Sequence, residues 1–208
     1  EAVAKFASEL VEEGLQVQEY DWDLDMHFVE DAEELGPLTA QYIFVVDSLN
    51  FCFWPTDGLE YEHLAGLLKS VIEKDKDAFN AVALARVTAE DLLRWFSPWQ
   101  IPQIEERALR VQEVGQALLA HFDGLALNMV KAANRSAVQL VDLITQHFAG
   151  FRDHAVYQGR QVAFLKRAQI LVSDIWGAYG RRKPDIFASH PCAFTDLDQL
   201  TMFADYRV

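Results

Sequence analysis

Apolar residues recur at helical spacing along most of the chain. Gln161–Tyr179, for example, is predicted to be a long apolar helix that includes Val162, Leu165 and Ile175, and it ends at Gly180. Comparable patterns, with their own start and stop residues, predict further helices. These are Val3–Glu13, Leu64–Lys74, Thr88–Phe96, Pro102–Phe122, Leu125–Ala133 and Ser136–Phe148. The predicted fold class is therefore mainly α.

One stretch departs from this periodicity. Tyr42–Trp54 reads YIFVVDSLNFCFW and is almost continuously apolar, with many β-branched and aromatic residues. The polar segment Asp47–Asn50 interrupts it, and Pro55 follows. This pattern is typical of a buried strand, a polar turn and then a short strand or a helix start. We therefore expect a small β element near residues 42–54.

Composition and charge exclude several classes of protein. The chain has 208 residues, of which 18 are Lys or Arg and 32 are Asp or Glu, so its net charge is −14. A surface this acidic repels nucleic-acid phosphates and anionic lipids, which argues against a nucleic-acid coat protein and against membrane binding through a basic patch. Hydrophobic residues make up 51%, which is too many for a disordered chain. The length suits a single domain over residues 1–208.

The sequence lacks the common motifs for metals, cofactors and disulfide frameworks. Cys52 and Cys192 are its two cysteines, and we expect them as free thiols in a reducing compartment, the cytoplasm. No zinc spacing, dinucleotide fingerprint, P-loop or serine-hydrolase motif occurs. No apolar run approaches the ~20 residues that a membrane span needs. We therefore expect no metal, no cofactor and no membrane partner.

Polar residues inside two apolar segments are candidates for a ligand site. Asp47 and Asn50 lie in the apolar run, where a carboxylate must be hydrogen-bonded or line a pocket, or else caps a turn. Lys166 and Arg167 lie in the most apolar predicted helix. Their cations either face solvent on an amphipathic helix or bind a phosphate or carboxylate in a cleft.

Two further candidates lie near the ends of the chain. Asp205 stands between Phe203 and Tyr206, and aromatic rings beside a carboxylate suit a pocket that stacks a flat ligand. The alternative is a turn or helix-start residue paired with Arg207. His27 lies in an acidic segment, where it is either solvated or functional.

Several of these segments together resemble the queuosine salvage protein family. They are FVVDSLNFCFW (Phe44–Trp54), HFAGFRD at the end of Ser136–Asp153, VAFLKRAQILVSDIW (Val162–Trp176) and LTMFADYRV (Leu200–Val208). The resemblance runs in order from about His27 to the last residue. Its motifs are long and specific.

The resemblance implies an enzyme that hydrolyses the N-glycosidic bond of queuosine 5′-monophosphate and releases queuine, a 7-deazaguanine base, and ribose 5-phosphate. It implies a fold similar to helical DNA glycosylases, with the substrate in a deep pocket. The family's nucleophilic or base-positioning Asp corresponds to Asp205, and Phe203 and His27 correspond to substrate contacts. Family members continue well beyond FADYR, so we expect this domain to be truncated at its C-terminus.

The remaining site predictions come from charge and position. We expect Lys166 and Arg167 to bind the phosphate, Asp47 to bind the base or brace its own segment, and Tyr206 to help hold the flat base. The substrate is a small nucleotide, and no stable nucleic-acid partner is expected. Two other functions stay open, namely a helical glycosylase that flips a base out of nucleic acid and a non-catalytic nucleoside-binding domain.

Overall fold

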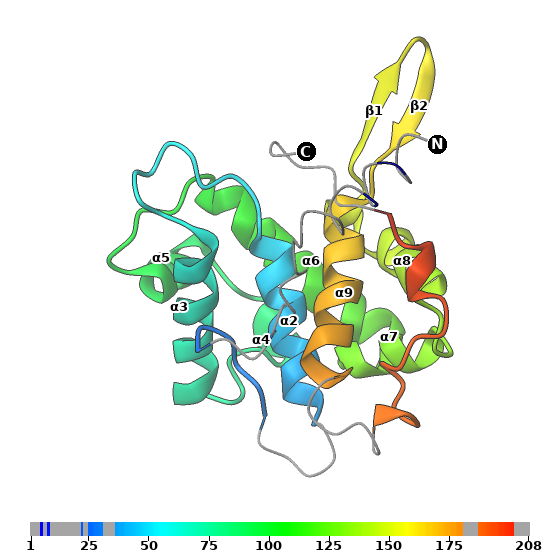
Figure 1. The fold of residues 1–208 in the computed structure, drawn as a ribbon. Coiled ribbons are helices and arrows are strands. Elements are labelled where there is room, and N and C mark those ends of the chain that lie inside the picture. The colour runs from blue at the N-terminus through cyan, green and yellow to red at the C-terminus, as the bar shows by residue number, and fades with distance from the viewer. Residues whose placement is uncertain are drawn as a thin grey trace.

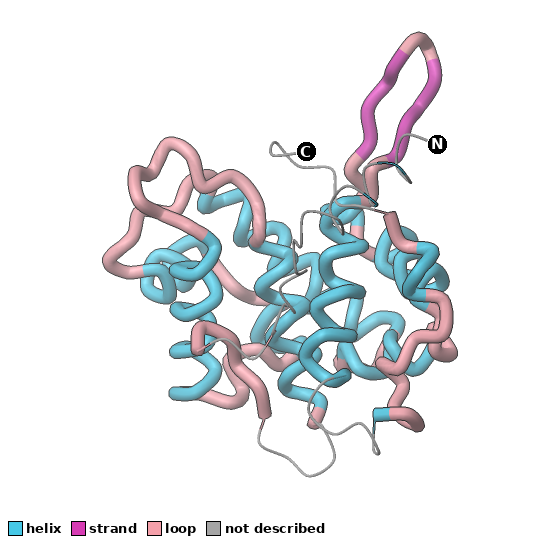
Figure 2. The backbone as a smooth tube through the Cα atoms, viewed as in Figure 1, coloured by secondary structure: helices cyan, strands magenta, loops and turns pink. Residues whose placement is uncertain are grey.

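The computed structural model describes residue 5, residue 8, residue 22 and the ranges 25–30, 36–180 and 187–201. Apart from Lys5 and Ser8, which are helical, the predicted helix Val3–Glu13 lies outside these residues. In the described part of the chain the fold is mainly helical with one small antiparallel sheet, as predicted (Figures 1 and 2). None of the described helices is long and apolar enough to cross a membrane.

Helices follow one another along most of the described chain. They are α2 (Pro37–Leu49), α3 (Tyr61–Lys74), α4 (Ala81–Leu84), α5 (Ala89–Phe96), α6 (Ile104–His121), α7 (Ala126–Ala132), α8 (Ala137–His147) and α9 (Lys166–Gly180), with 3₁₀ turns η1 (Ala149–Phe151) and η2 (Leu197–Gln199). Side-chain caps begin two of them where the sequence predicted a start. The Thr88 hydroxyl accepts from Asp91 N, and Ser136 Oγ accepts from Gln139 N.

The predicted β element near residues 42–54 is wrong, because Pro37–Leu49 forms helix α2. Every residue from Thr39 to Leu49 is buried, so the helix shows no polar stripe. A helix that is apolar all round gives the same unbroken pattern as a buried strand. Ser48 is not a turn residue either, since its hydroxyl donates to Val45 O within the helix.

The sheet lies elsewhere, in a hairpin of β1 (His154–Tyr157) and β2 (Arg160–Ala163) that projects from the helical body (Figure 1). Gln158 and Gly159 form its two-residue turn with φ of 48° and 74°. All eight strand residues are exposed. The predicted helix Gln161–Tyr179 is therefore wrong at its start, and α9 begins at Lys166.

Helices α2 and α9 lie side by side and antiparallel at the centre of the fold (Figure 1). At one end the Tyr179 hydroxyl donates to Gly36 O and accepts from Ala40 N, each at 3.0 Å. At the other end Arg167 Nη1 donates to Ser48 O. This pairing brings polar residues in the middle of both helices close together.

Candidate functional site

A cavity of about 540 Å³ opens beside the α2–α9 pair. One face of α9 supplies Ile170, Ser173, Asp174 and Gly177, which share that face because they follow the i, i+3, i+4, i+7 spacing. The other lining residues come from the N-terminal segment, the end of α2, α3, α9 and η2. They are Trp22, His27, Asn50, Tyr61, Trp176 and Leu197. The cavity is thus lined mainly by aromatic and apolar side chains with a few polar groups, as small-molecule sites usually are.

Aromatic rings form one wall of this cavity. The rings of Trp22 and His27 stack with centroids 4.0 Å apart and an interplanar angle of 13°. His27 Nδ1 donates to Trp22 O at 2.7 Å, because a carbonyl only accepts, and Nε2 lies 3.0 Å from the Tyr61 hydroxyl. Gly177 lets this wall approach α9, since a Cβ there would lie 3.3 Å from Trp22 Cβ. The wall is therefore held in a fixed orientation.

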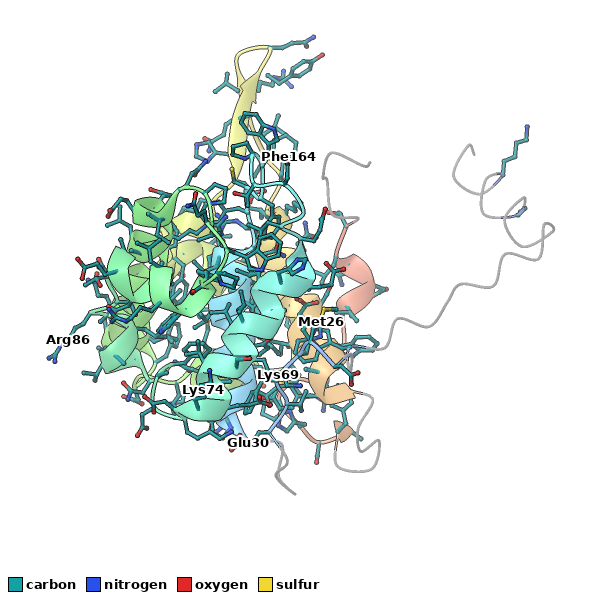
Figure 3. The ribbon with its side chains drawn as sticks, turned by 90° about the vertical axis from the view of Figure 1, so that its left-hand side faces the viewer. Met26, Glu30, Lys69, Lys74, Arg86 and Phe164 are labelled. Carbon is teal, nitrogen blue, oxygen red and sulfur yellow. The ribbon has the colours of Figure 1, made fainter. Side chains whose placement is uncertain are left out.

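The segment that carries His27 is tied to α3 and α2. Lys69 Nζ donates to Asp25 O at 2.7 Å, and the Tyr42 hydroxyl lies 3.4 Å from Met26 O. Figure 3 labels Met26 and Lys69 close to each other near the middle of the view. These bonds position the aromatic wall over the helical core.

A pair of interacting carboxyl groups lies at the α2–α9 contact. Asp174 lines the cavity, and Asp47 is fully buried at 0% exposure. Burial and the nearby Asp174 carboxylate raise the pKa of Asp47 well above its usual range. Arg167 and Asn50 lower it only in part. Burial likewise raises the pKa of Asp174 to about 7, although the Trp22 indole lowers it in part.

Neither Asp47 oxygen has a hydrogen-bond partner among the described residues. Asn50 is near enough to lower the pKa of Asp47, yet its amide lies outside hydrogen-bond geometry. The indole N–H of Trp22 stands in the same relation to Asp174. Buried polar groups are nearly always bonded, so this cluster is the unusual feature of the site.

The C-terminal end of α2 is held by two arginines. Arg107 is 0% exposed and donates to the carbonyls of Pro102, Leu49, Phe51 and Cys52. Arg167 donates to the carbonyls of Ser48 and Gly150. The Phe51 ring lies between them, 4.4 Å from Arg107 Cζ and 5.1 Å from Arg167 Cζ. This arginine clamp fixes Asn50 at the cavity.

Hydrogen bonds also hold the first residue of α9 and the segment that ends at Thr201. Lys166 N donates to Asp153 Oδ2 at 2.9 Å. Gln169 is 7% exposed, and its Oε1 accepts from Thr201 N at 2.7 Å and from Thr201 Oγ1 at 3.1 Å. Thr201 follows the cavity-lining Leu197 by four residues. The described chain thus runs along α9 up to residue 201.

The predicted site residues fall into three groups. His27 lines the cavity, and Asp47 lies behind it next to Asp174. Lys166 is the first residue of α9, whereas Arg167 belongs to the arginine clamp. The three remaining predictions, Phe203, Asp205 and Tyr206, lie outside the described residues.

Most of the lining residues were not predicted from the sequence, among them Trp22, Tyr61 and Asp174. Nothing in the sequence singled out Trp22 or Tyr61 as a site residue. Asp174 did carry a signal, because it is an acidic residue on the apolar face of a helix. The same reasoning that singled out Asp47 would have found it.

Comparison with known proteins gives a consistent set of relatives. A family model described as "Queuosine salvage protein" matches residues 28–208. A queuosine 5′-phosphate N-glycosylase/hydrolase of Dictyostelium discoideum is 48% identical over 171 residues, which cover 82% of this chain and 51% of the relative. Proteins with the same name from Sphaerobacter thermophilus and Mus musculus are 40% and 34% identical and cover 100% and 84% of this chain.

The chain spans between about half and two thirds of the length of these relatives, with 51%, 64% and 56% of the three covered. The match takes in α2 to α9 and the FADYR motif, and it begins one residue after His27.

Proposed function

The chain belongs to the queuosine salvage protein family, and from this premise we propose that the protein containing it hydrolyses the N-glycosidic bond of queuosine 5′-monophosphate. The products are queuine and ribose 5-phosphate. The names of the relatives support the reaction, since they are queuosine 5′-phosphate N-glycosylase/hydrolases. The observation that carries the proposal in this chain is the aromatic cavity with a carboxyl group in its wall.

The chemistry of the reaction fits such a cavity. Breaking a ribosyl C–N bond builds positive charge at the anomeric carbon, as in other glycoside hydrolyses. A carboxylate beside that carbon stabilises the charge, attacks it or orients a water molecule, and one well-placed group contributes roughly 10²–10³ in rate. The flat base binds between aromatic rings.

We assign the carboxylate at the anomeric carbon to Asp205, with Phe203 and Tyr206 as contacts to the substrate. These roles rest on the resemblance of the FADYR motif. The bonds from Thr201 to Gln169 support them, because they hold the chain beside the cavity-lining helix one residue before the 202–208 segment. His27 is the proposed aromatic contact on the opposite wall.

The 5′-phosphate needs hydrogen-bond donors, and we propose that Lys166 supplies them at the start of α9. Lys166 stands four residues before the cavity-lining Ile170, on the same face of the helix. The backbone N–H of Lys166 already donates to the Asp153 carboxylate, so the proposed phosphate contact is the Lys166 side chain. Arg167 was also predicted to bind the phosphate. Its guanidinium group instead donates to two backbone carbonyls, which supports an indirect role in which Arg167 positions Lys166.

The net charge of −14 supports the proposal that the protein has no stable nucleic-acid partner, and the names of the relatives support a small nucleotide as substrate. We also propose a cytoplasmic location, which the two free cysteines of the described chain support. The proposed likeness to helical DNA glycosylases is one of architecture and rests on the mainly helical fold.

The test is an assay of base release by the full-length protein. Wild type and Asp205→Asn are incubated with queuosine, its 5′-monophosphate and adenosine 5′-monophosphate, and free bases are measured by mass spectrometry. We expect queuine from the monophosphate with wild type and a loss of at least about 10³-fold in Asp205→Asn. Asp198→Asn, at an exposed position of η2, is the matched control and keeps full activity.

Two outcomes would contradict the proposal. No base released from any substrate by wild type points to a binding domain without turnover. Base release from a tRNA that carries queuosine, at a rate above that of the free monophosphate, points to an enzyme that flips the base out of nucleic acid.

A further inference from the structure

Three of the five buried side-chain polar atoms without a hydrogen-bond partner in the described chain lie at the contact between the cavity and α2. Trp22 lines the cavity at 3% exposure, and its indole N–H has no hydrogen-bond partner among the described residues. Asp47 is 0% exposed, and both of its oxygens are likewise without a partner. Asp174 lies between them, since it interacts with each. A buried polar group without a partner costs about 1–3 kcal/mol, so three such atoms at one place need a cause.

A ligand in the cavity meets this cluster through Asp174, because Asp47 lies behind it and the Trp22 indole N–H is itself a donor. Asp174 is the member of the cluster that lines the cavity, and an ionised carboxylate accepts hydrogen bonds through both oxygens. Two donors that lie side by side in the plane of a flat ring match such a carboxylate in a bidentate arrangement. The aromatic wall of Trp22 and His27 would hold that ring.

We propose that Asp174, with Asp47 behind it, is the specificity determinant of the cavity: its carboxylate accepts hydrogen bonds from the donor edge of a heteroaromatic base, a ring N–H next to an amino group. This inference rests on the proposed function and adds the identity of the residue that recognises the base. A base of the 7-deazaguanine type carries that edge. A 7-deazaadenine of the same size presents a ring nitrogen that only accepts.

Asp47 is a positioning residue in this arrangement. It comes from the middle of α2 and reaches no solvent, so a ligand in the cavity meets Asp174 first. Two neighbouring carboxyl groups in a dry site do not both ionise easily, because like charges repel. With its proton retained, Asp47 leaves the single negative charge on Asp174, where the donor edge binds.

The arrangement makes base binding depend on pH with a definite sign. Donors bind the ionised Asp174, whose pKa of about 7 in the free protein falls on binding. Affinity for 7-deazaguanine is therefore highest above pH 7 and falls about tenfold per pH unit well below it.

Other titratable groups interact with the carboxyl pair or line the same cavity. Asp47 and Tyr42 come from α2, Arg167 from α9, Tyr61 from α3 and His27 from the N-terminal segment. The buried side chains of α8 are apolar. A variant of Asp174 itself is therefore needed to assign the pH dependence.

The experiment compares two probes of nearly the same shape, the free bases 7-deazaguanine and 7-deazaadenine. Their affinities for the full-length protein are measured by calorimetry from about pH 6 to about pH 8.5, a range that brackets the pKa of Asp174. At pH 8 we expect wild type to prefer 7-deazaguanine by roughly 10- to 100-fold, as for a good bidentate pair. In Asp174→Asn the preference falls to within about threefold, and the pH dependence of 7-deazaguanine binding disappears.

Two further variants complete the comparison. Asp47→Asn imitates the protonated form that we assign to Asp47 and so tests that assignment, and a change of the preference by more than about threefold would contradict it. Asp142→Asn, at an exposed position of α8, changes neither the preference nor its pH dependence. The thermal unfolding midpoint of each variant confirms that it folds.

An Asp174→Asn protein that is folded and keeps the wild-type preference would overturn the inference. This result is distinct from failure of the proposed function. Base release by wild type with an unchanged preference in Asp174→Asn rejects the inference alone. A preference that depends on Asp174, without base release from queuosine 5′-monophosphate, rejects the reaction and keeps the base-reading site.

Discussion

Helix α2 contacts two clusters of ionisable side chains, the arginine clamp and the carboxyl pair. The clamp makes many hydrogen bonds, whereas Asp47 of the carboxyl pair makes none to the described residues. At the C-terminal end of α2 the arginine clamp donates from Arg107 and Arg167 to six backbone carbonyls, those of Pro102, Leu49, Phe51, Cys52, Ser48 and Gly150. One turn earlier Asp47 makes no hydrogen bond to the described residues, and Asp174 beside it faces a cavity.

This difference indicates that the arginine clamp stabilises the fold and that the carboxyl pair takes part in binding. Carbonyls at a helix end need donors, and buried guanidinium groups satisfy them, so the clamp is complete without any ligand. The carboxyl pair is not complete, because folding buries Asp47 without a hydrogen-bond donor among the described residues. We therefore expect changes in the clamp to act on stability, and changes in the carboxyl pair to act on binding and on the pH dependence of stability.

The largest effect on stability is expected from Arg107→Leu. This change removes the donors to four carbonyls at a position with 0% exposure, so the free energy of unfolding should fall by about 3–5 kcal/mol. Urea denaturation of the full-length protein measures it. A loss below about 1 kcal/mol would mean that the clamp is dispensable and that the two clusters do not differ in this way.

Asp47→Asn should change stability in the other direction. The native state must keep this buried carboxyl group protonated, whereas the unfolded chain ionises it with an ordinary pKa of 3.8. Removing that cost should stabilise the protein by about 1–3 kcal/mol at pH 8, and the gain should shrink at about pH 5. Denaturation at both pH values tests this. A variant destabilised at pH 8 would show that Asp47 is a satisfied structural residue.

The carboxyl pair also gives wild-type stability a recognisable pH dependence. The pKa of Asp174 is about 7 in the folded protein and an ordinary 3.8 in the unfolded chain, so between these values the folded state binds more protons. The contribution is present in full below pH 4 and is lost as the pH rises through 7. Other carboxylates act oppositely, since hydrogen bonds lower the pKa of Asp91 and Asp196. The measurement is therefore the difference between wild type and a double Asp47→Asn, Asp174→Asn variant. Equal pH profiles would contradict the account.

The smallest effect is expected from Gly177→Ala at the aromatic wall. A Cβ at this position would lie 3.3 Å from Trp22 Cβ, whereas one at Gly66 in α3 meets nothing within 4 Å. Both changes favour the helix by about 0.5–1 kcal/mol. Gly66→Ala should keep that gain, and Gly177→Ala should lose most of it and bind 7-deazaguanine severalfold more weakly as Trp22 moves. If both variants gain the same stability and bind 7-deazaguanine equally well, the close contact between Trp22 and α9 is not required.

Sequence predicted the amphipathic helices well and the central elements poorly. Helices such as α5 and α8 show a polar face and a capping residue, Thr88 or Ser136, and both features are local. Helix α2 is buried all round, so its periodicity is lost. The hairpin fails for the opposite reason, because its strands are wholly exposed and carry no core-facing alternation.

The candidate site was predictable from the sequence only where a residue carries a local signal. A carboxylate inside an apolar segment is visible in the sequence, so Asp47 was found, and Asp174 carries the same signal. That the two meet depends on the antiparallel packing of α2 and α9, which are more than a hundred residues apart along the chain. The roles of Phe203, Asp205 and Tyr206 stay predictions, since they lie outside the described residues.

We propose above that a ligand in the cavity donates hydrogen bonds to Asp174, the member of the carboxyl pair that lines the cavity. The most direct measurement is the titration of the Asp174 side-chain carboxyl carbon by ¹³C NMR in the full-length protein, with and without saturating 7-deazaguanine. The account predicts a pKa of about 7 in the free protein and a decrease of at least about one unit in the complex. An unchanged pKa on saturation would contradict it.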